Sequence, residues 1–276
     1  MTLLDDHAGR AVDTRATLEA RQISFGYHDR PISVDLDLVI PDQSFTVIVG
    51  PNACGKSTLL RALSRLLKPT SGEVVLDGRD ISSYPSKEVA RRLGLLPQTS
   101  LAPDGITVAD LVARGRFPYQ SALRQWSKAD ERAVSSALSA TGTTSLSTRL
   151  VDELSGGQRQ RVWVAMVLAQ ETPLLLLDEP TTFLDIAHQI GLLELFQELN
   201  REHGHTIVAV LHDLNHAARY ASHMVAMRHG EIVASGTPAE VLTEETVERV
   251  FDLPCRVIED PVSGTPLVLP DGRPTH

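Results

Sequence analysis

Residues 44–58 read SFTVIVGPNACGKST, and this stretch decides the fold. The apolar run 44–50 predicts a buried strand, and the repeated leucines of 56–67 predict the helix that follows it. Between them lies the pattern G-x-x-x-x-G-K-[ST], in which a curled glycine backbone presents successive N–H groups to a phosphate. Strand, loop and helix agree with one another, so a plain glycine turn with a surface lysine is the weaker interpretation.

The loop predicts a nucleotide site whose ligands are ATP and Mg²⁺. Lys56 supplies positive charge to the β- and γ-phosphates, Ser57 offers a hydroxyl to Mg²⁺, and Thr58 donates to the α-phosphate. Tyr27 is expected to stack on adenine, although a core tyrosine is the alternative. The predicted ATP-binding residues are Tyr27, Gly50, Pro51, Asn52, Ala53, Cys54, Gly55, Lys56, Ser57 and Thr58.

Cys54 lies inside this loop, close to a helix N-terminus and to Lys56. Such surroundings make a thiol unusually reactive when solvent can reach it. The hypothesis is that alkylation of Cys54 blocks ATP binding and that ATP protects the thiol. The alternative is that cysteine serves here as a small filler residue.

A second part of the site follows the all-leucine run 174–177. A strand that is apolar at every position is typical of a parallel sheet, and ligands bind at the carboxyl ends of such strands. Asp178 is expected to hold Mg²⁺ beside Ser57, and Glu179 to orient and polarise the water that attacks the γ-phosphate. The alternative is an acid pair that caps the next helix, and the presence of a phosphate loop makes this alternative the weaker interpretation.

Two more polar side chains follow predicted strands. His212 comes after the apolar run 206–211 and is expected to contact the γ-phosphate, although a lone histidine is more often structural. Gln98 follows the segment 93–97 and is expected to reach Mg²⁺ and the attacking water, on a weaker signal. The predicted catalytic residues are Glu179, His212 and Gln98, and the predicted metal ligands are Ser57, Gln98 and Asp178.

Composition narrows the functional class. The 276 residues carry a net charge of −9, which argues against a nucleic-acid partner, because such proteins usually present a basic face. No apolar run approaches the roughly eighteen residues that span a bilayer, and the acidic start does not resemble a signal peptide. The two cysteines form neither a disulfide framework nor a metal cluster, so we expect a reducing compartment inside the cell.

Strands alternate with helices along the chain, which predicts an α/β fold with a parallel sheet. Residues 1–16 are expected to be flexible, and 17–236 to form the main domain. Within that domain the stretch from about 103 to 170 is predicted to be a helical insertion. The extension 237–276 is expected to pack on the domain with one helix and two short strands.

The segment LSGGQ, 154–158, predicts a second phosphate seat. Ser155 and Gln158 form a capping box, a sufficient reason for a helix to start there. Gly156 and Gly157 then occupy the first turn, where glycine costs about 1 kcal/mol against alanine. A plain cap does not need two glycines, whereas close approach of a phosphate does.

These motifs, in this order, resemble those of ABC transporter ATPases: the phosphate loop, Gln98, LSGGQ, LLLLDEP, TTFLD and His212. The resemblance implies a P-loop NTPase cassette with a RecA-like parallel-sheet core, an antiparallel β subdomain and an α-helical insertion. It also implies a head-to-tail dimer in which each ATP lies between one copy's phosphate loop and the other copy's signature. The residues expected to contact the partner's ATP are Ser155, Gly156, Gly157 and Gln158, with Asp185 at the dimer interface.

The segments 96–134, 50–69 and 180–189 resemble those of iron-siderophore importers, in particular the ferric-enterobactin group. This implies an ATPase subunit on the cytoplasmic face of the membrane, bound to an integral membrane permease and working indirectly with a substrate-binding protein. Arg114, Gly115, Arg116, Phe117, Pro118 and Tyr119 are the candidate permease contacts. A helix end followed by an exposed turn is the alternative for that segment.

Other functions stay open. A cobalamin or haem importer belongs to the same class, and a soluble ABC-type ATPase for iron–sulfur cluster assembly belongs to another. A ribosome-associated ATPase is disfavoured by the single cassette and the acidic balance. Co-purification separates the first two classes, since an importer travels with a polytopic membrane protein and an assembly factor with soluble partners.

Overall fold

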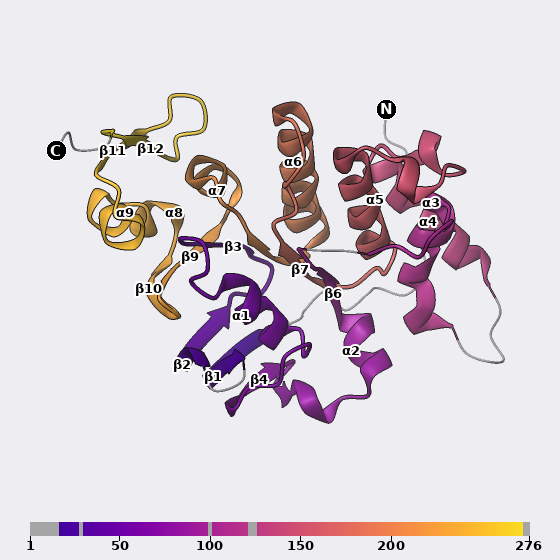
Figure 1. Cartoon of the computed structure of the whole chain (residues 1–276), viewed down its shortest axis with the longest axis horizontal. Helices are drawn as coiled ribbons and strands as arrows, with labels where there is room; N and C mark the ends of the chain where they lie inside the picture. Colours follow the sequence, from indigo (N-terminus) through magenta and orange to yellow (C-terminus); the bar gives the residue numbers. More distant parts are fainter. Residues whose placement is uncertain (1–16, 28–29, 99–100, 121–125, 273–276) are drawn as a thin grey trace.

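The computed structural model describes residues 17–27, 30–98, 101–120 and 126–272. The segment 1–16, predicted to be flexible, lies outside the described residues. Within them, six strands form the central sheet in the order β10-β9-β3-β8-β7-β6 (Figure 1). These strands are β3 (Phe45–Val49), β6 (Leu93–Leu96), β7 (Leu174–Asp178), β8 (Thr206–Val210), β9 (His223–Arg228) and β10 (Glu231–Gly236). All neighbours pair in parallel except β9 and β10, so the predicted α/β core with a parallel sheet is confirmed.

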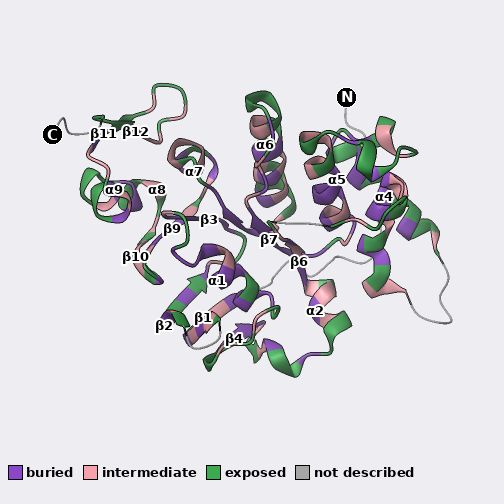
Figure 2. Cartoon of the chain, viewed as in Figure 1, coloured by how far each residue is buried: buried purple, intermediate pink, exposed green. Residues whose placement is uncertain are grey.

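Both faces of this sheet are buried, as its uniformly apolar strands predict. Successive side chains point to opposite faces, so Leu175 and Leu177 join one hydrophobic cluster while Leu174 and Leu176 join the other. Helices α5 (Gly156–Leu168), α6 (Ile186–His203) and α7 (Leu214–Tyr220) cover the first face, and α1 (Lys56–Leu63) covers the second (Figures 1 and 2).

An antiparallel sheet lies below α1, with the strand order β2-β1-β4-β5 (Figure 1). Its strands are β1 (Leu18–Tyr27), β2 (Arg30–Ile40), β4 (Ser71–Leu76) and β5 (Arg79–Asp80). The last two are joined by a turn at Asp77 and Gly78, both of which have positive φ. Apolar side chains of β1, β2 and β4 share a buried cluster with α1, which fixes this sheet under the phosphate loop.

Between β5 and β7 the described residues form β6 and several helices. Besides α5, these helices are η1 (Ile81–Ser83), α2 (Ser86–Arg92), α3 (Val108–Ala113), η2 (Arg114–Tyr119), α4 (Lys128–Ala140), η3 (Thr144–Leu146) and η4 (Val151–Glu153). Within the predicted helical insertion, α3 ends at Ala113, because the chain turns into a 3₁₀ helix around Gly115 and Pro118. The helix predicted over 56–67 ends at Leu63, where Arg65 takes a left-handed conformation.

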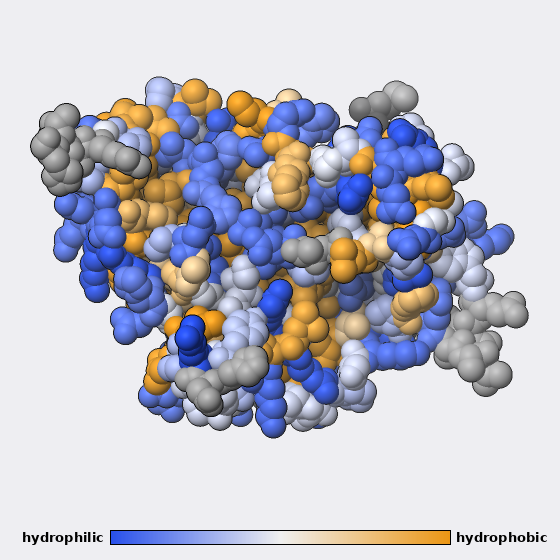
Figure 3. All heavy atoms as spheres, in the orientation of Figure 1, coloured by the Kyte–Doolittle hydropathy of each residue, from blue (hydrophilic) through white to orange (hydrophobic). Residues whose placement is uncertain are grey.

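The C-terminal elements are α8 (Pro238–Val241), α9 (Glu244–Phe251), β11 (Cys255–Glu259) and β12 (Pro266–Pro270). The β11–β12 hairpin contacts α7, where the Asn215 side chain bonds both the N–H and the carbonyl of Val268. Hydrophilic residues cover most of the face seen in Figure 3, with apolar patches between them. Among the described helices, none has both the length and the apolar character that crossing a membrane requires.

Candidate nucleotide site

The phosphate loop between β3 and α1 depends on two glycines with positive φ. Gly50 has φ 154°, and a Cβ there would lie 2.2 Å from the Met227 carbonyl oxygen. Gly55 has φ 107° and stands directly before α1, where no side chain caps the helix. The first N–H groups of a helix have no partner inside it, so an uncapped start is a natural anion seat.

A cavity of about 510 Å³ lies over this helix start. Its lining residues are Ile32, Asn52, Ala53, Gly55, Lys56, Ser57, Thr58, Gln98, Glu179 and His212. The last three follow β6, β7 and β8, whose carboxyl ends meet at this edge of the sheet. Parallel pairing thus unites side chains that lie far apart in the sequence, as predicted.

The ammonium group of Lys56 is held inside the loop. Its Nζ donates to the carbonyl oxygens of Gly50 and Pro51, at 2.8 Å each, and lies 3.9 Å from the Cys54 sulfur. Cys54 itself is only 4% exposed, and its side chain belongs to the cluster beneath α1. The structure therefore contradicts a solvent-accessible thiol at this position and favours the alternative of a buried filler residue.

Asp178 ends β7 and is buried, with 3% of the residue exposed. The Ser57 hydroxyl donates to its Oδ1 at 2.9 Å. Burial raises the pKa of Asp178 above its usual value and the charge of Glu179 adds to the rise, although the Ser57 hydrogen bond opposes it. A hydroxyl and a carboxylate side by side are hard oxygen donors of the kind Mg²⁺ prefers, so the residues fit the predicted metal.

Glu179 lies where three side-chain donors converge. Gln98 Nε2 and His212 Nε2 lie 2.9 Å and 2.8 Å from its Oε1, and the Thr182 hydroxyl donates to its Oε2 at 3.3 Å. Gln98 and His212, predicted to serve separate ligands, thus meet on one carboxylate. Glu179 also has φ 53°, a strained conformation for a non-glycine residue of the kind that clusters at functional sites.

Tyr27 ends β1 outside the cavity lining, and its ring is partly exposed. Its hydroxyl accepts a hydrogen bond from Arg61 Nη1 at 2.9 Å. Ile32 of β2 lines the cavity instead, a residue that the sequence did not single out because alternation predicts only a half-buried strand there. Arg61 was missed as well, since a basic residue on a helix carries no signal of its own.

The LSGGQ segment begins α5 with a complete capping box. Gln158 N donates to Ser155 Oγ, and Ser155 N donates to Gln158 Oε1 at 3.1 Å. Gly157 has a further reason to lack a side chain, because a Cβ there would lie 3.3 Å from the Phe183 carbonyl oxygen and from the Leu184 side chain, whereas a Cβ at Gly156 would meet Phe183 at an ordinary 3.4 Å. Of these residues, all described, none lines the cavity of its own chain.

Asp185 is the exposed N-cap of α6. It accepts hydrogen bonds from the backbone N–H of His188 at 2.9 Å and pairs with the His188 ring at 2.7 Å. These two contacts, the backbone one first, hold the pKa of Asp185 below its usual value. The carboxylate of Asp185 is thus ionised, and contacts from α6 fix its orientation.

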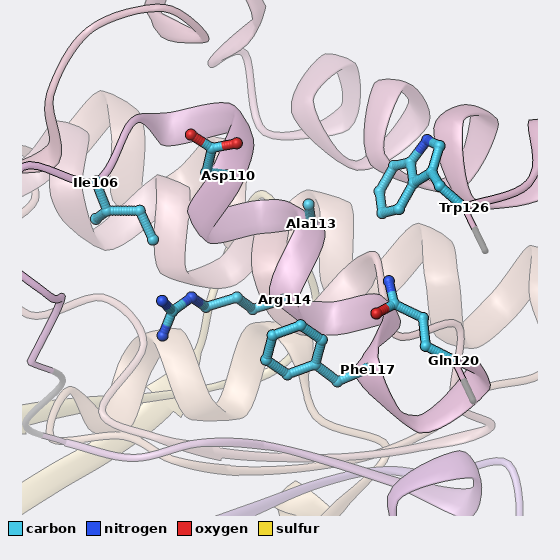
Figure 4. A pocket seen from close by; sticks show the side chains of 7 residues that line it. All are labelled: Ile106, Asp110, Ala113, Arg114, Phe117, Gln120 and Trp126. Atoms are coloured by element: carbon cyan, nitrogen blue, oxygen red, sulfur yellow. The ribbon is translucent and has the colours of Figure 1, made fainter. Parts of the chain in front are cut away.

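A second cavity, of about 530 Å³, lies among the helices (Figure 4). Its lining residues are Ile106, Asp110, Ala113, Arg114, Phe117, Gln120 and Trp126. Of the six candidate permease contacts, Arg114 and Phe117 face this cavity, and Phe117 is 56% exposed. Gly115 and Arg116 are buried, and this corrects the prediction for those two residues, which no partner can touch directly.

Comparison with known proteins agrees with this geometry. The family model for the ABC transporter matches residues 34–182. The ferric enterobactin transport ATP-binding protein FepC of Escherichia coli (strain K12) is 59% identical, over 94% of this chain and 95% of its own length. The iron(3+)-hydroxamate import ATP-binding protein FhuC of Bacillus subtilis (strain 168) is 46% identical, over 92% of this chain and 94% of its own.

Among solved structures, the ATP-binding cassette MJ0796, a dimer in a post-hydrolysis state bound to ADP and Pi, superposes with a TM-score of 0.71. It is 26% identical and covers 80% of this chain and 98% of its own. Sequence motifs, sheet topology and site geometry converge with these matches. The chain belongs to the ABC transporter family, as one of its ATP-hydrolysing cassettes.

Proposed function

We propose that this cassette hydrolyses ATP to drive uptake of a ferric siderophore through a membrane permease. The observation that carries the ATPase part is the meeting of Glu179, Gln98 and His212 at the mouth of the phosphate loop. The siderophore part is supported by the identity to the ferric enterobactin relative, which extends over nearly the whole length of both chains.

In this proposal the loop residues 50–58 cradle the phosphates of ATP, and Lys56 leaves its carbonyl partners for the β- and γ-phosphates. Ser57, Asp178 and Gln98 hold Mg²⁺, which neutralises phosphate charge when bound. Glu179 orients the attacking water, and Gln98 and His212 fix that carboxylate in place. Phosphoryl transfer asks the protein mainly for such positioning.

The working unit is proposed to be a head-to-tail dimer. Ser155, Gly156, Gly157 and Gln158 of one copy complete the ATP site of the other, with Asp185 at the interface. Two facts support this: these residues begin a helix at the surface but take no part in their own chain's cavity, and the structural neighbour MJ0796 is a dimer.

The second cavity is the proposed permease site. Apolar Ile106, Ala113, Phe117 and Trp126 line it together with the charged Asp110 and Arg114. This mixture suits a short amphipathic helix on the cytoplasmic side of the permease. The permease would hold the cassette at the membrane and link it to a substrate-binding protein.

The test is uptake of radiolabelled iron chelates in cells that lack this gene. Loss of siderophore uptake, restored by the wild-type gene but not by one carrying Glu179→Gln, is the expected result. Normal uptake of every siderophore, with loss of cobalamin or haem uptake, would transfer the assignment to those substrates. Co-purification with soluble partners and no polytopic membrane protein would favour an assembly ATPase instead.

A further inference from the structure

The 3₁₀ helix η2 forms one wall of the second cavity and is held in place by the buried side chain of Arg116. Arg116, only 4% exposed, directs its Nε to Asp130 Oδ1 at 2.9 Å and its Nη1 to the Ala169 carbonyl and to Glu171 Oε2, at 2.7 Å each. Its guanidinium also lies 4.2 Å from the centre of the Tyr119 ring. A buried charge persists only where partners compensate its lost hydration, so this geometry is specific to a forked guanidinium.

Asp130 takes part in this arrangement as an ionised carboxylate. Burial by itself would raise its pKa, but hydrogen bonds from Ser127 and Arg116 outweigh that effect and hold the pKa below its usual value. The carboxylate is therefore charged at neutral pH and joins α4 to the 3₁₀ helix η2.

The same wall is tied to α2 and to the residues that follow α5. The Tyr119 hydroxyl donates to the Gln170 carbonyl at 2.9 Å, and Arg91 Nε donates to the Pro118 carbonyl at 2.9 Å. Lys87 Nζ donates to the Gln120 carbonyl at 2.8 Å. Backbone carbonyls as acceptors fix the path of the main chain rather than a single side chain.

These anchors lead directly to the two strands that carry catalytic side chains. The Gln170 amide donates to the carbonyls of Ala90 and, at 3.2 Å, Leu93. Leu93 begins β6, and Gln98 lies two residues beyond the end of this strand at Leu96. Glu171 lies shortly before β7, which ends at Asp178 and is followed directly by Glu179. The contact between Gln98 and Glu179 therefore joins strands whose opposite ends are both fixed to the cavity wall.

We propose that Arg116 is a positioning residue that couples the second cavity to the nucleotide site. It fixes η2 against the amino ends of β6 and β7, so that a partner pressing on the wall changes how Gln98 meets Glu179. This inference rests on the proposed function, because the permease is the partner in that cavity.

The test compares Arg116→Lys and Tyr119→Phe with the wild type and with the matched control Arg132→Lys, whose arginine is exposed on α4. Lysine keeps the charge but loses the fork, and phenylalanine loses one hydroxyl without changing shape. Both variants should keep the basal kcat and KM for ATP, while permease-stimulated ATPase falls about threefold to thirtyfold. The control should be stimulated normally.

Hydrogen exchange gives a second readout that needs no permease. In the wild type, Mg-ATP should slow exchange in 93–98 and in 114–120 together. In Tyr119→Phe and Arg116→Lys, Mg-ATP should still slow exchange in residues 93–98 but should leave exchange in residues 114–120 unchanged. If Arg116→Lys fails to fold, Tyr119→Phe decides the matter.

Equal stimulation and equal exchange in the variants and the wild type would overturn the coupling role. A wild-type chain that no permease stimulates would refute the proposed function instead. The exchange experiment then still decides the inference, since a wild type with no response at 114–120 contradicts it.

Discussion

Glu179 illustrates how much of this site depends on single residues. It lies directly after a fully buried strand, takes a positive φ, and receives contacts from the residues that follow β6 and β8 and from its own following loop. The strain of such a conformation, of order 1–3 kcal/mol, is tolerated because the surrounding contacts over-determine it. The chain thus concentrates a carboxylate, an amide and an imidazole within one hydrogen-bond shell beside the phosphate loop.

Lys56→Ala should weaken ATP binding about tenfold to a hundredfold, because a charge-assisted contact of about 1.5–3 kcal/mol is lost. The same change removes the two hydrogen bonds that hold the loop's carbonyls at Gly50 and Pro51. Nucleotide titration at fixed Mg²⁺ measures the effect, with Lys68→Ala, an exposed lysine, as the control. Unchanged affinity in Lys56→Ala would refute the phosphate contact.

Asp178→Asn should raise the unfolding temperature at neutral pH when neither nucleotide nor Mg²⁺ is present. The folded chain raises the pKa of Asp178, so this group favours folding below its ordinary value of 3.8 and loses that contribution as pH rises through the folded pKa. Each kcal/mol that the neutral amide adds to the free energy of unfolding should raise the unfolding temperature by about 2–4 °C. The gain should shrink as pH falls toward 3.8, and thermal scans across pH check it.

A lower midpoint for Asp178→Asn at neutral pH would contradict the unfavourable burial of that charge. The same variant should lose stabilisation by Mg²⁺ with ATP while keeping the Ser57 hydrogen bond, since an amide oxygen still accepts it. A variant that Mg-ATP stabilises as strongly as the wild type would exclude Asp178 as a metal ligand.

At the scale of elements, the start of α5 and the loop before α6 form one unit. Gln160 Nε2 donates to the Pro180 carbonyl at 3.0 Å, and Gln189 Nε2 donates to the carbonyls of Thr181 and Leu184. Gly157 of the LSGGQ segment lets this loop approach, so it serves packing inside the chain as well as the proposed phosphate contact. Packing and the proposed phosphate contact each favour glycine in this helix turn, and helix capping alone explains neither.

Mixed dimers should show that this turn acts on the partner's ATP. With Ser155→Arg in one copy and Lys56→Ala in the other, both lesions fall in the same shared site, and one ATP should still bind. With both changes in one copy, each site carries a lesion and tight binding should disappear. Nucleotide occupancy of purified mixed dimers measures this, and the reverse pattern would show that each signature serves its own chain.

The elements that the sequence predicted best are those with a uniform pattern. The runs 174–177 and 207–210 are apolar at every position, a pattern typical of a sheet that is covered on both faces. The break at Gly115, the short α2 and the burial of Cys54 follow from contacts between distant segments, which no local pattern contains. Ile32 was missed for the same reason, since the turn around Gly55 and β2 brings it to the cavity.

At the scale of the whole molecule, Glu179→Gln should bind ATP, stop turning it over and accumulate as an ATP-bound dimer. Glutamine keeps the shape that Gln98 and His212 contact but cannot polarise water, and loss of a general base typically lowers rates about a hundredfold or more. Light scattering with and without Mg-ATP measures the mass. Full turnover, or a monomer at saturating ATP, would contradict the shared-site arrangement.

The placement of β7 has a consequence for synthesis of the chain. This strand pairs with β6 before it in the sequence and with β8 after it, and its four leucines are shielded on both sides of the sheet only once later segments arrive. A nascent polypeptide that stops before residue 206 exposes an apolar strand with an unpaired edge, and such edges promote aggregation. Fragments ending between 180 and 205 should therefore collect in inclusion bodies even though they carry the entire phosphate loop, and those extended through β10 should stay in the soluble fraction.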